Sequence, residues 1–129
     1  MIDIVDAMNL IEYGLEVSGY NVIPRLKSFL VKDLFEIFSE EFGLTYQYGE
    51  PRVSEKLHEI MIATEEVPRT HYIKDTNTYY MHYTDMAKDN DRVMRNEAEL
   101  VSSKFGSDDS VLPKEELRQV LENYNYFKQ

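Results

Sequence analysis

The sequence predicts a single, mainly α-helical domain of five helices with one β-hairpin. Three observations indicate this fold class. Apolar residues recur every three or four positions over most of the chain. β-Branched and aromatic residues concentrate in one short stretch around residues 71–83. The length of 129 residues is that of one domain, so we expect residues 1–129 to share one hydrophobic core.

The first two helices are expected near residues 4–18 and 24–42. Acidic residues precede the first helix and suit its positive N-terminal end, and Gly19 can terminate it. Its apolar positions follow helical spacing: Ile4, Ala7, Met8, Ile11 and Leu15. Pro24 suits the first turn of the second helix, and Gly43 follows its last residue. Apolar side chains cover most of the circumference of the second helix, so it should be the central one.

A third helix is expected near residues 51–66, between Pro51 and Pro68. Residues 71–83 follow, with two aromatic and β-branched runs around Asp75-Thr76-Asn77, a pattern typical of a β-hairpin. The last two helices are expected near residues 86–105 and 113–126, each with an apolar stripe.

The order of three helices, a hairpin and a further helix resembles the winged helix-turn-helix of the PadR and MarR regulator families. The resemblance covers roughly residues 19–95. Residues 33–45 look like the first helix and turn of such a unit, and residues 53–60 look like its recognition helix. Residues 78–85 are similar to the second wing strand entering a capped helix, and Gly19-Tyr20-Asn21-Val22-Ile23 is similar to an element of PadR proteins.

This resemblance implies a DNA-binding transcriptional regulator, and it implies which side chains contact DNA. Arg52, Ser54 and Lys56 would enter the major groove, while Arg69 and Lys74 would contact phosphates. The segment 44–74 carries four basic and five acidic residues and is the least acidic third of the chain. Because DNA binding commonly neutralises about 6–10 phosphates, a homodimer is expected. The alternative is that these five side chains form an ordinary solvated surface.

An acidic protein that binds a basic, nucleic-acid-handling partner is the alternative function, as in phage-type inhibitors and DNA mimics. The formal net charge of −10 favours association with cationic clefts. The candidate contacts are acidic residues of the first helix and tyrosines of the hairpin: Asp3, Asp6, Glu12, Glu16, Tyr79 and Tyr80. The tyrosines either form a recognition surface or pack across the strands onto the core.

Several chemistries are not supported. The chain has no cysteine, which excludes a thiol nucleophile, a cysteine zinc site and an iron–sulfur cluster. The histidines His58, His71 and His82 lack the spacing of a metal site. No catalytic or nucleotide-binding motif occurs, so we expect neither an enzyme nor a cofactor. No signal peptide or apolar run of about 18 residues is present, which favours a cytoplasmic protein without a membrane segment.

Overall fold

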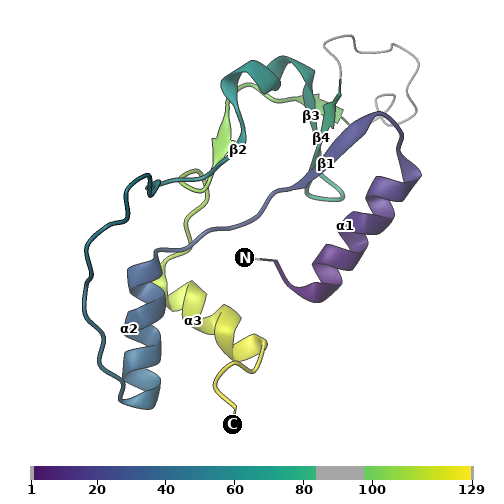
Figure 1. The fold of residues 1–129 in the computed structure, drawn as a ribbon. Coiled ribbons are helices and arrows are strands. Elements are labelled where there is room, and N and C mark those ends of the chain that lie inside the picture. Colours follow the sequence, from purple (N-terminus) through teal and green to yellow (C-terminus); the bar gives the residue numbers. More distant parts are fainter. Residues whose placement is uncertain (1, 84–97, 129) are drawn as a thin grey trace. The chain divides into compact units, whose positions relative to one another are not determined.

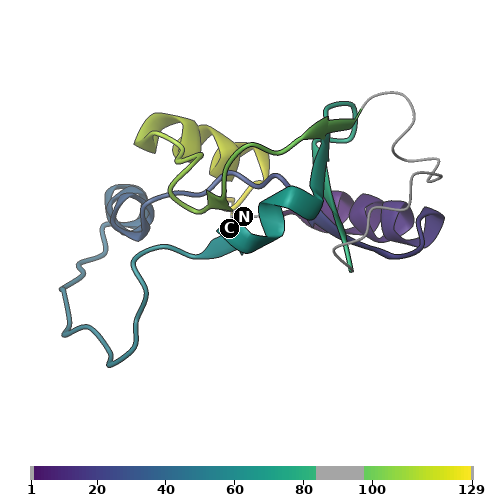
Figure 2. The same ribbon diagram turned by 90° about the horizontal axis from the view of Figure 1, so that it is seen from above.

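The chain has a mixed α/β fold, seen in a computed structural model that describes residues 2–83 and 98–128 (Figure 1, Figure 2). The described residues form three α-helices, one 3₁₀ helix and six short strands. They divide into two compact units. Unit 1 comprises residues 1–26 and 60–106, and unit 2 comprises residues 27–59 and 107–129. Each unit is therefore built from two separate segments of the chain.

The centre of unit 1 is the antiparallel hairpin of β3 (Thr70–Ile73) and β4 (Thr78–His82). In its turn Asn77 adopts a φ of 50°, a left-handed conformation that Asn tolerates better than most residues. The N–H of Asn77 donates to the carbonyl of Lys74 at 3.1 Å. The predicted hairpin at residues 71–83 is thereby confirmed.

This hairpin is the middle of a larger sheet. β1 (Tyr20–Pro24) pairs with β4, and β5 (Ala98–Leu100) pairs with β3, so the strand order is β1-β4-β3-β5 and every pair is antiparallel. β-Branched residues at positions 22 and 23 suit a strand. β1 and β5 are therefore the edge strands of this sheet.

Helix α1 (Ile4–Glu16) precedes β1 and lies alongside it in both views (Figure 1, Figure 2). Asp3 caps the helix, because its Oδ1 accepts the backbone N–H of Asp6 at 2.8 Å. After the helix, Gly19 takes a φ of 86°, which glycine adopts without the steric cost of a side chain. The predicted helix near 4–18 is confirmed in position.

One face of the sheet carries the core of unit 1. Part of this core comes from three elements that follow or precede the sheet strands in the chain: β2 (Ile60–Ile62), β6 (Phe105–Gly106) and the 3₁₀ helix η1 (Thr64–Arg69). β2 and β6 pair with each other. Ile62, Tyr79 and Phe105 are buried together in this core. Four partly buried side chains pack against them: Ile23, Val67, Tyr72 and Val101.

Unit 2 is a pair of helices, α2 (Val31–Phe42) and α3 (Lys114–Asn123). Ile37, Leu117 and Leu121 form its buried centre, and partly buried apolar side chains surround them: Phe29, Leu34, Phe38 and Phe127. Gly43 ends α2 with a φ of 64°. α3 confirms the helix that was predicted near residues 113–126.

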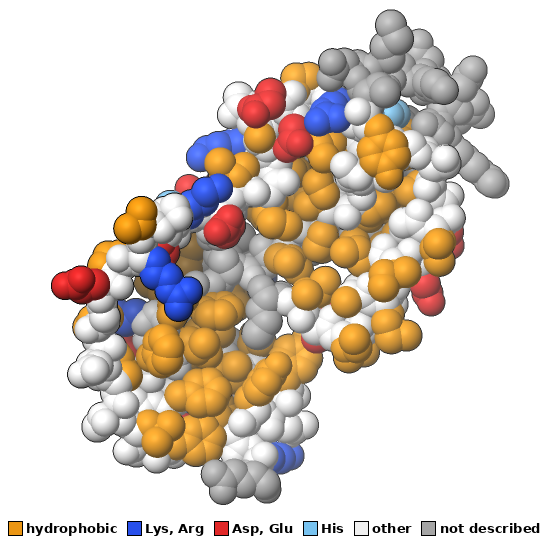
Figure 3. Space-filling view, viewed as in Figure 1, with side chains coloured by type: hydrophobic (Ala, Val, Ile, Leu, Met, Phe, Trp, Pro, Cys, Tyr) orange, Lys and Arg blue, Asp and Glu red, His pale blue; other side chains and the backbone are white. Residues whose placement is uncertain are grey.

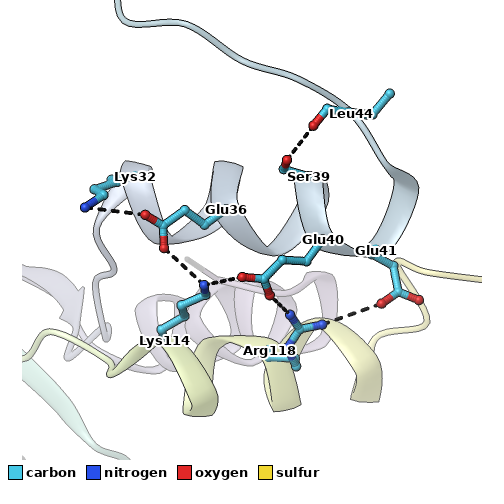
Figure 4. A network of polar contacts seen from close by, with 8 residues as sticks. All are labelled: Lys32, Glu36, Ser39, Glu40, Glu41, Leu44, Lys114 and Arg118. Atoms are coloured by element: carbon cyan, nitrogen blue, oxygen red, sulfur yellow. Dashed lines mark hydrogen bonds and ion pairs between the residues drawn. The ribbon is translucent and has the colours of Figure 1, made fainter.

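Ion pairs join α2 to α3 on the solvent side of this core (Figure 4). The Lys114 ammonium lies 3.0 Å from Glu36 and 2.6 Å from Glu40. The Arg118 guanidinium contacts Glu40 and lies 3.5 Å from Glu41. Much of the negative charge of α2 is therefore balanced within unit 2.

The prediction of a mainly α-helical, winged-helix-like fold with five helices is wrong. The hairpin belongs to a four-stranded sheet, so it is not an isolated wing. The helix expected at residues 51–66, with its recognition part at 53–60, is not formed, since residues 50–59 contain neither helix nor strand and β2 and η1 follow. The apolar residues Val53 and Leu57 of this segment are almost fully exposed. They contact no core, and helical spacing without a buried face gives little stability.

Two other predicted helices also differ. The helix expected at residues 24–42 begins only at Val31: Pro24 belongs to the strand that pairs with β4, and residues 25–30 are not helical. Of the helix expected at 86–105, residues 86–97 lie outside the described residues, and residues 98–100 and 105–106 are strands. Across residues 2–83 and 98–128, no helix is long and apolar enough to cross a bilayer.

Candidate protein-binding surface

Helix α1 presents an apolar row that no described element buries. Ala7, Leu10 and Tyr13 are the half-buried positions of this helix. Four apolar side chains on another face repeat at intervals of four, three and four residues and are 57–82% exposed: Ile4, Met8, Ile11 and Leu15. We call these four residues the α1 row. Figure 3 shows hydrophobic side chains gathered over α1 with acidic side chains beside them. Such a continuous apolar surface is typical of a binding site.

An open groove adjoins the α1 row. Its volume is about 540 Å³, and it lies between α1 and the edge strand β1. The lining residues come from α1, β1 and β4: Leu10, Ile11, Gly14, Tyr20, Asn21, Val22, Ile23 and Met81. Gly14 lies on the helix side of the groove, where a Cβ would meet only Val22 Cγ2, at 4.0 Å. Ile11 belongs to both the row and the groove, so the two form one apolar surface.

All the charged side chains of the N-terminal segment, residues 1–24, are acidic. The first 24 residues contain four acidic residues and no Lys or Arg. Glu12 and Glu16 are exposed and lie one turn apart on α1. Asp6 is also exposed, while Asp3 is half-buried at the cap. The four predicted acidic contacts therefore occur together on this helix and its cap.

The two predicted tyrosine contacts lie elsewhere. Tyr79 and Tyr80 are buried in β4. Tyr79 packs against Tyr72 and Phe105, with ring centroids 5.0 and 5.2 Å apart, and burial raises the pKa of Tyr80. They pack across the strands, as the second interpretation of these residues proposed, and do not extend the α1 surface.

The residues predicted to contact DNA are divided between the two units. Arg52, Ser54 and Lys56 lie in the irregular part of unit 2, where Ser54 has a φ of 72°. In unit 1, Lys74 is at the turn after β3. Arg69 is engaged inside its own unit. It donates to the carbonyls of His82 at 2.7 Å and Tyr83 at 3.1 Å.

Arg69 also forms an ion pair with Glu66 at 3.4 Å. These bonds give its guanidinium a structural role at the end of η1. The DNA contacts were expected on a recognition helix, and residues 50–59 do not form one.

The histidines do not assemble a metal centre within the described residues. His71 and His82 are buried on neighbouring strands, with ring centroids 6.2 Å apart, while His58 lies exposed in unit 2. No group of three potential metal ligands occurs in residues 2–83 and 98–128. His71 Nδ1 and His82 Nε2 are buried without a hydrogen-bond partner in that same part of the chain.

The groove itself was missed at the sequence level. Its walls come from residues that are far apart in the chain, such as Gly14 and Met81, and helical spacing cannot identify such a pair. One local signal was present. A glycine in the middle of a helix costs about 1 kcal/mol relative to alanine, so Gly14 departs from helical preference at a position that lines the groove.

A second exposed cluster, on unit 2, was also missed. Phe35 stacks on Tyr46, with ring centroids 5.8 Å apart, and Tyr46 meets Tyr48 edge to face, with ring centroids 5.9 Å apart. Phe35 belongs to the helix that was expected to be the central one, yet it is half exposed. Comparison of the chain with models of protein families, with curated proteins and with solved structures finds no match.

Proposed function

We propose that this chain is a non-catalytic binding protein that engages a basic partner protein through α1. The observation that supports this function is the exposed α1 row beside carboxylates, within a 24-residue segment that contains no Lys or Arg. A basic partner with an apolar strip complements both properties.

The apolar row would supply most of the affinity. Full burial of an aliphatic side chain is worth about 1.5–3 kcal/mol relative to exposure, and the row offers four such side chains. The carboxylates would act mainly on association rate and partner choice, because exposed charges steer encounter and disfavour like-charged partners. In unit 2, by contrast, Glu36 and Glu40 are already paired with Lys114.

The same charges argue against a homodimer built on α1. Pairing two copies of this helix would bring Glu12 and Glu16 of one copy near the acidic residues of the other, and no basic residue of the segment could offset the repulsion. A different, basic protein is therefore the better partner for this surface than a second copy of the chain.

The test is selection of short random peptides by the immobilised protein at ~50 mM salt, where charge contacts are strongest. Peptides rich in Lys or Arg and aliphatic residues should be enriched. Neutralising α1 with Asp6→Asn, Glu12→Gln and Glu16→Gln should weaken their binding by about tenfold. Asp3 is retained because it caps the helix.

The matched control neutralises three exposed acidic residues of α3, with Glu115→Gln, Glu116→Gln and Glu122→Gln. This variant should bind the selected peptides as the unmodified protein does. Equal binding by the α1 variant would contradict the proposal. Binding of a short DNA duplex that is lost on replacing Arg52 and Lys56 would favour the DNA-binding function instead.

A further inference from the structure

The edge strand β1 carries backbone groups that point away from the sheet. In the hydrogen bonds that flank β1, Tyr83 N–H donates to the Gly19 carbonyl and Arg25 N–H donates to the Asn77 carbonyl. On the β1 side these bonds are made by Gly19 and Arg25, so the odd-numbered residues of this segment are the ones that bond to β4. Antiparallel pairs alternate between bonded and non-bonded positions, so the N–H and C=O of Val22 face the outer edge.

The groove adjoins β1, the strand that carries this outer edge. Met81 of β4 and four consecutive residues of β1, from Tyr20 to Ile23, line the groove. Because successive side chains of a strand point to opposite faces, these four β1 residues belong to both faces of the sheet. Their span is about 13 Å, from a rise of about 3.3 Å per residue. The opposite wall is helix α1, with Leu10, Ile11 and Gly14.

We infer that an extended segment of the basic partner adds to β1 as a fifth, outer strand, in the groove between β1 and α1. This inference rests on the proposed function and specifies how the partner binds. A groove between an edge strand and a helix suits strand addition, in which main-chain hydrogen bonds give affinity and alternate side chains give specificity. The volume of about 540 Å³ lies within the usual range of ligand-binding clefts.

The chemistry of the segment follows from the walls. One set of alternate side chains would face the apolar groove, so this set should be aliphatic. Glu12 and Glu16 lie exposed on α1, and the segment 1–24 contains no Lys or Arg, so Lys or Arg should occupy positions outside the groove. The added strand should be short. Pro24, the last residue of β1, has no N–H with which to continue the ladder.

The probe is a capped synthetic peptide of alternating Val and Lys, with two N-methylated analogues that each block one alternate set of its amides. The unmethylated peptide should bind the full chain. One analogue should bind at least about tenfold more weakly, because strand addition uses only one set of amides. On binding, hydrogen exchange of the Val22 amide should slow by at least about tenfold. Equal affinity of all three peptides, with no protection of Val22, would overturn the inference.

Two variants test the same geometry from the protein side. Val22→Pro removes the outward N–H and leaves the bonds to β4 in place, and Gly14→Leu places a side chain in the groove. Both should weaken binding by at least about tenfold, with far-UV circular dichroism confirming the fold. A different outcome is peptide binding that depends on the α1 carboxylates and yet is unchanged in both variants and with both methylated peptides. That result would reject strand addition and retain the proposed function. No enrichment of Lys- or Arg-rich peptides by the immobilised protein, or equal binding of those peptides by the α1 variant, would reject the proposed function itself.

Discussion

Single residues set the openness of the α1 surface, and Gly14 is the clearest case. Its Cα faces Val22 across the groove, and a methyl group would fit at ordinary van der Waals distance. Glycine is therefore not required by backbone conformation or by close packing at this position. The missing side chain widens the groove and lowers the stability of α1.

Gly14→Ala should accordingly raise the free energy of unfolding by about 0.5–1 kcal/mol, measured by urea denaturation. Gly43→Ala is the contrasting control. Its φ of 64° is left-handed, so alanine should destabilise the protein by about 1–2 kcal/mol. A loss of stability in Gly14→Ala would show that the helix needs closer contact with β1 than the structure indicates.

The buried pair of His71 and His82 predicts a pH dependence. Burial, followed by the neighbouring His82, lowers the pKa of His71 below its ordinary value of 6.5. The unfolded chain then takes up a proton at a higher pH than the folded chain does, so stability is full above pH 6.5 and declines as the pH falls below it. His71→Gln should flatten this decline in urea denaturation between neutral and mildly acidic pH. An unchanged slope would contradict this role for His71.

At the scale of elements, unit 2 depends on a small core between α2 and α3. Leu117 is fully buried beside Ile37 and Leu121. Leu117→Ala should cost about 2–5 kcal/mol, observed as an earlier loss of helical circular dichroism in urea. Leu57→Ala, at a residue that is 92% exposed, should change stability by no more than about 0.5 kcal/mol. Equal effects of both substitutions would contradict this core.

The ion pairs that join α2 and α3 predict a second, more acidic transition. Hydrogen bonds from Lys114 hold the pKa values of Glu36 and Glu40 below their ordinary value of 4.5. The stabilisation is therefore present above pH 4.5 and is lost as the pH falls below it. Lys114→Gln should reduce this loss in acid titrations followed by circular dichroism. Added salt should also weaken it, because the carboxylates are close to solvent.

Elements with local signals were predictable. The helices at 4–16 and 114–123 have an apolar stripe and acidic residues in the first turn, and the hairpin has aromatic runs around a turn. The third predicted helix failed for a physical reason. Helical spacing at Val53 and Leu57 met no partner surface, and packing decides the stability of most helices.

At the scale of the whole molecule, the unpredicted part of the fold is long-range strand pairing. Tyr20 pairs with His82, and Ile60 pairs with Gly106. β-Propensity reflects the surface on which a strand packs more than its own residues, so local patterns could not show that Tyr20–Pro24 is a strand. The acidic and apolar character of α1 was visible in the sequence, whereas the groove needed the pairing of β1 with β4.

Pro24 also limits how far the edge of unit 1 can recruit other chains. Exposed sheet edges are templates on which identical molecules can stack into fibrils. Because Pro24 has no amide hydrogen, a strand that pairs with β1 cannot continue its hydrogen bonds past this residue. Pro24 therefore limits edge-to-edge pairing of identical molecules along β1.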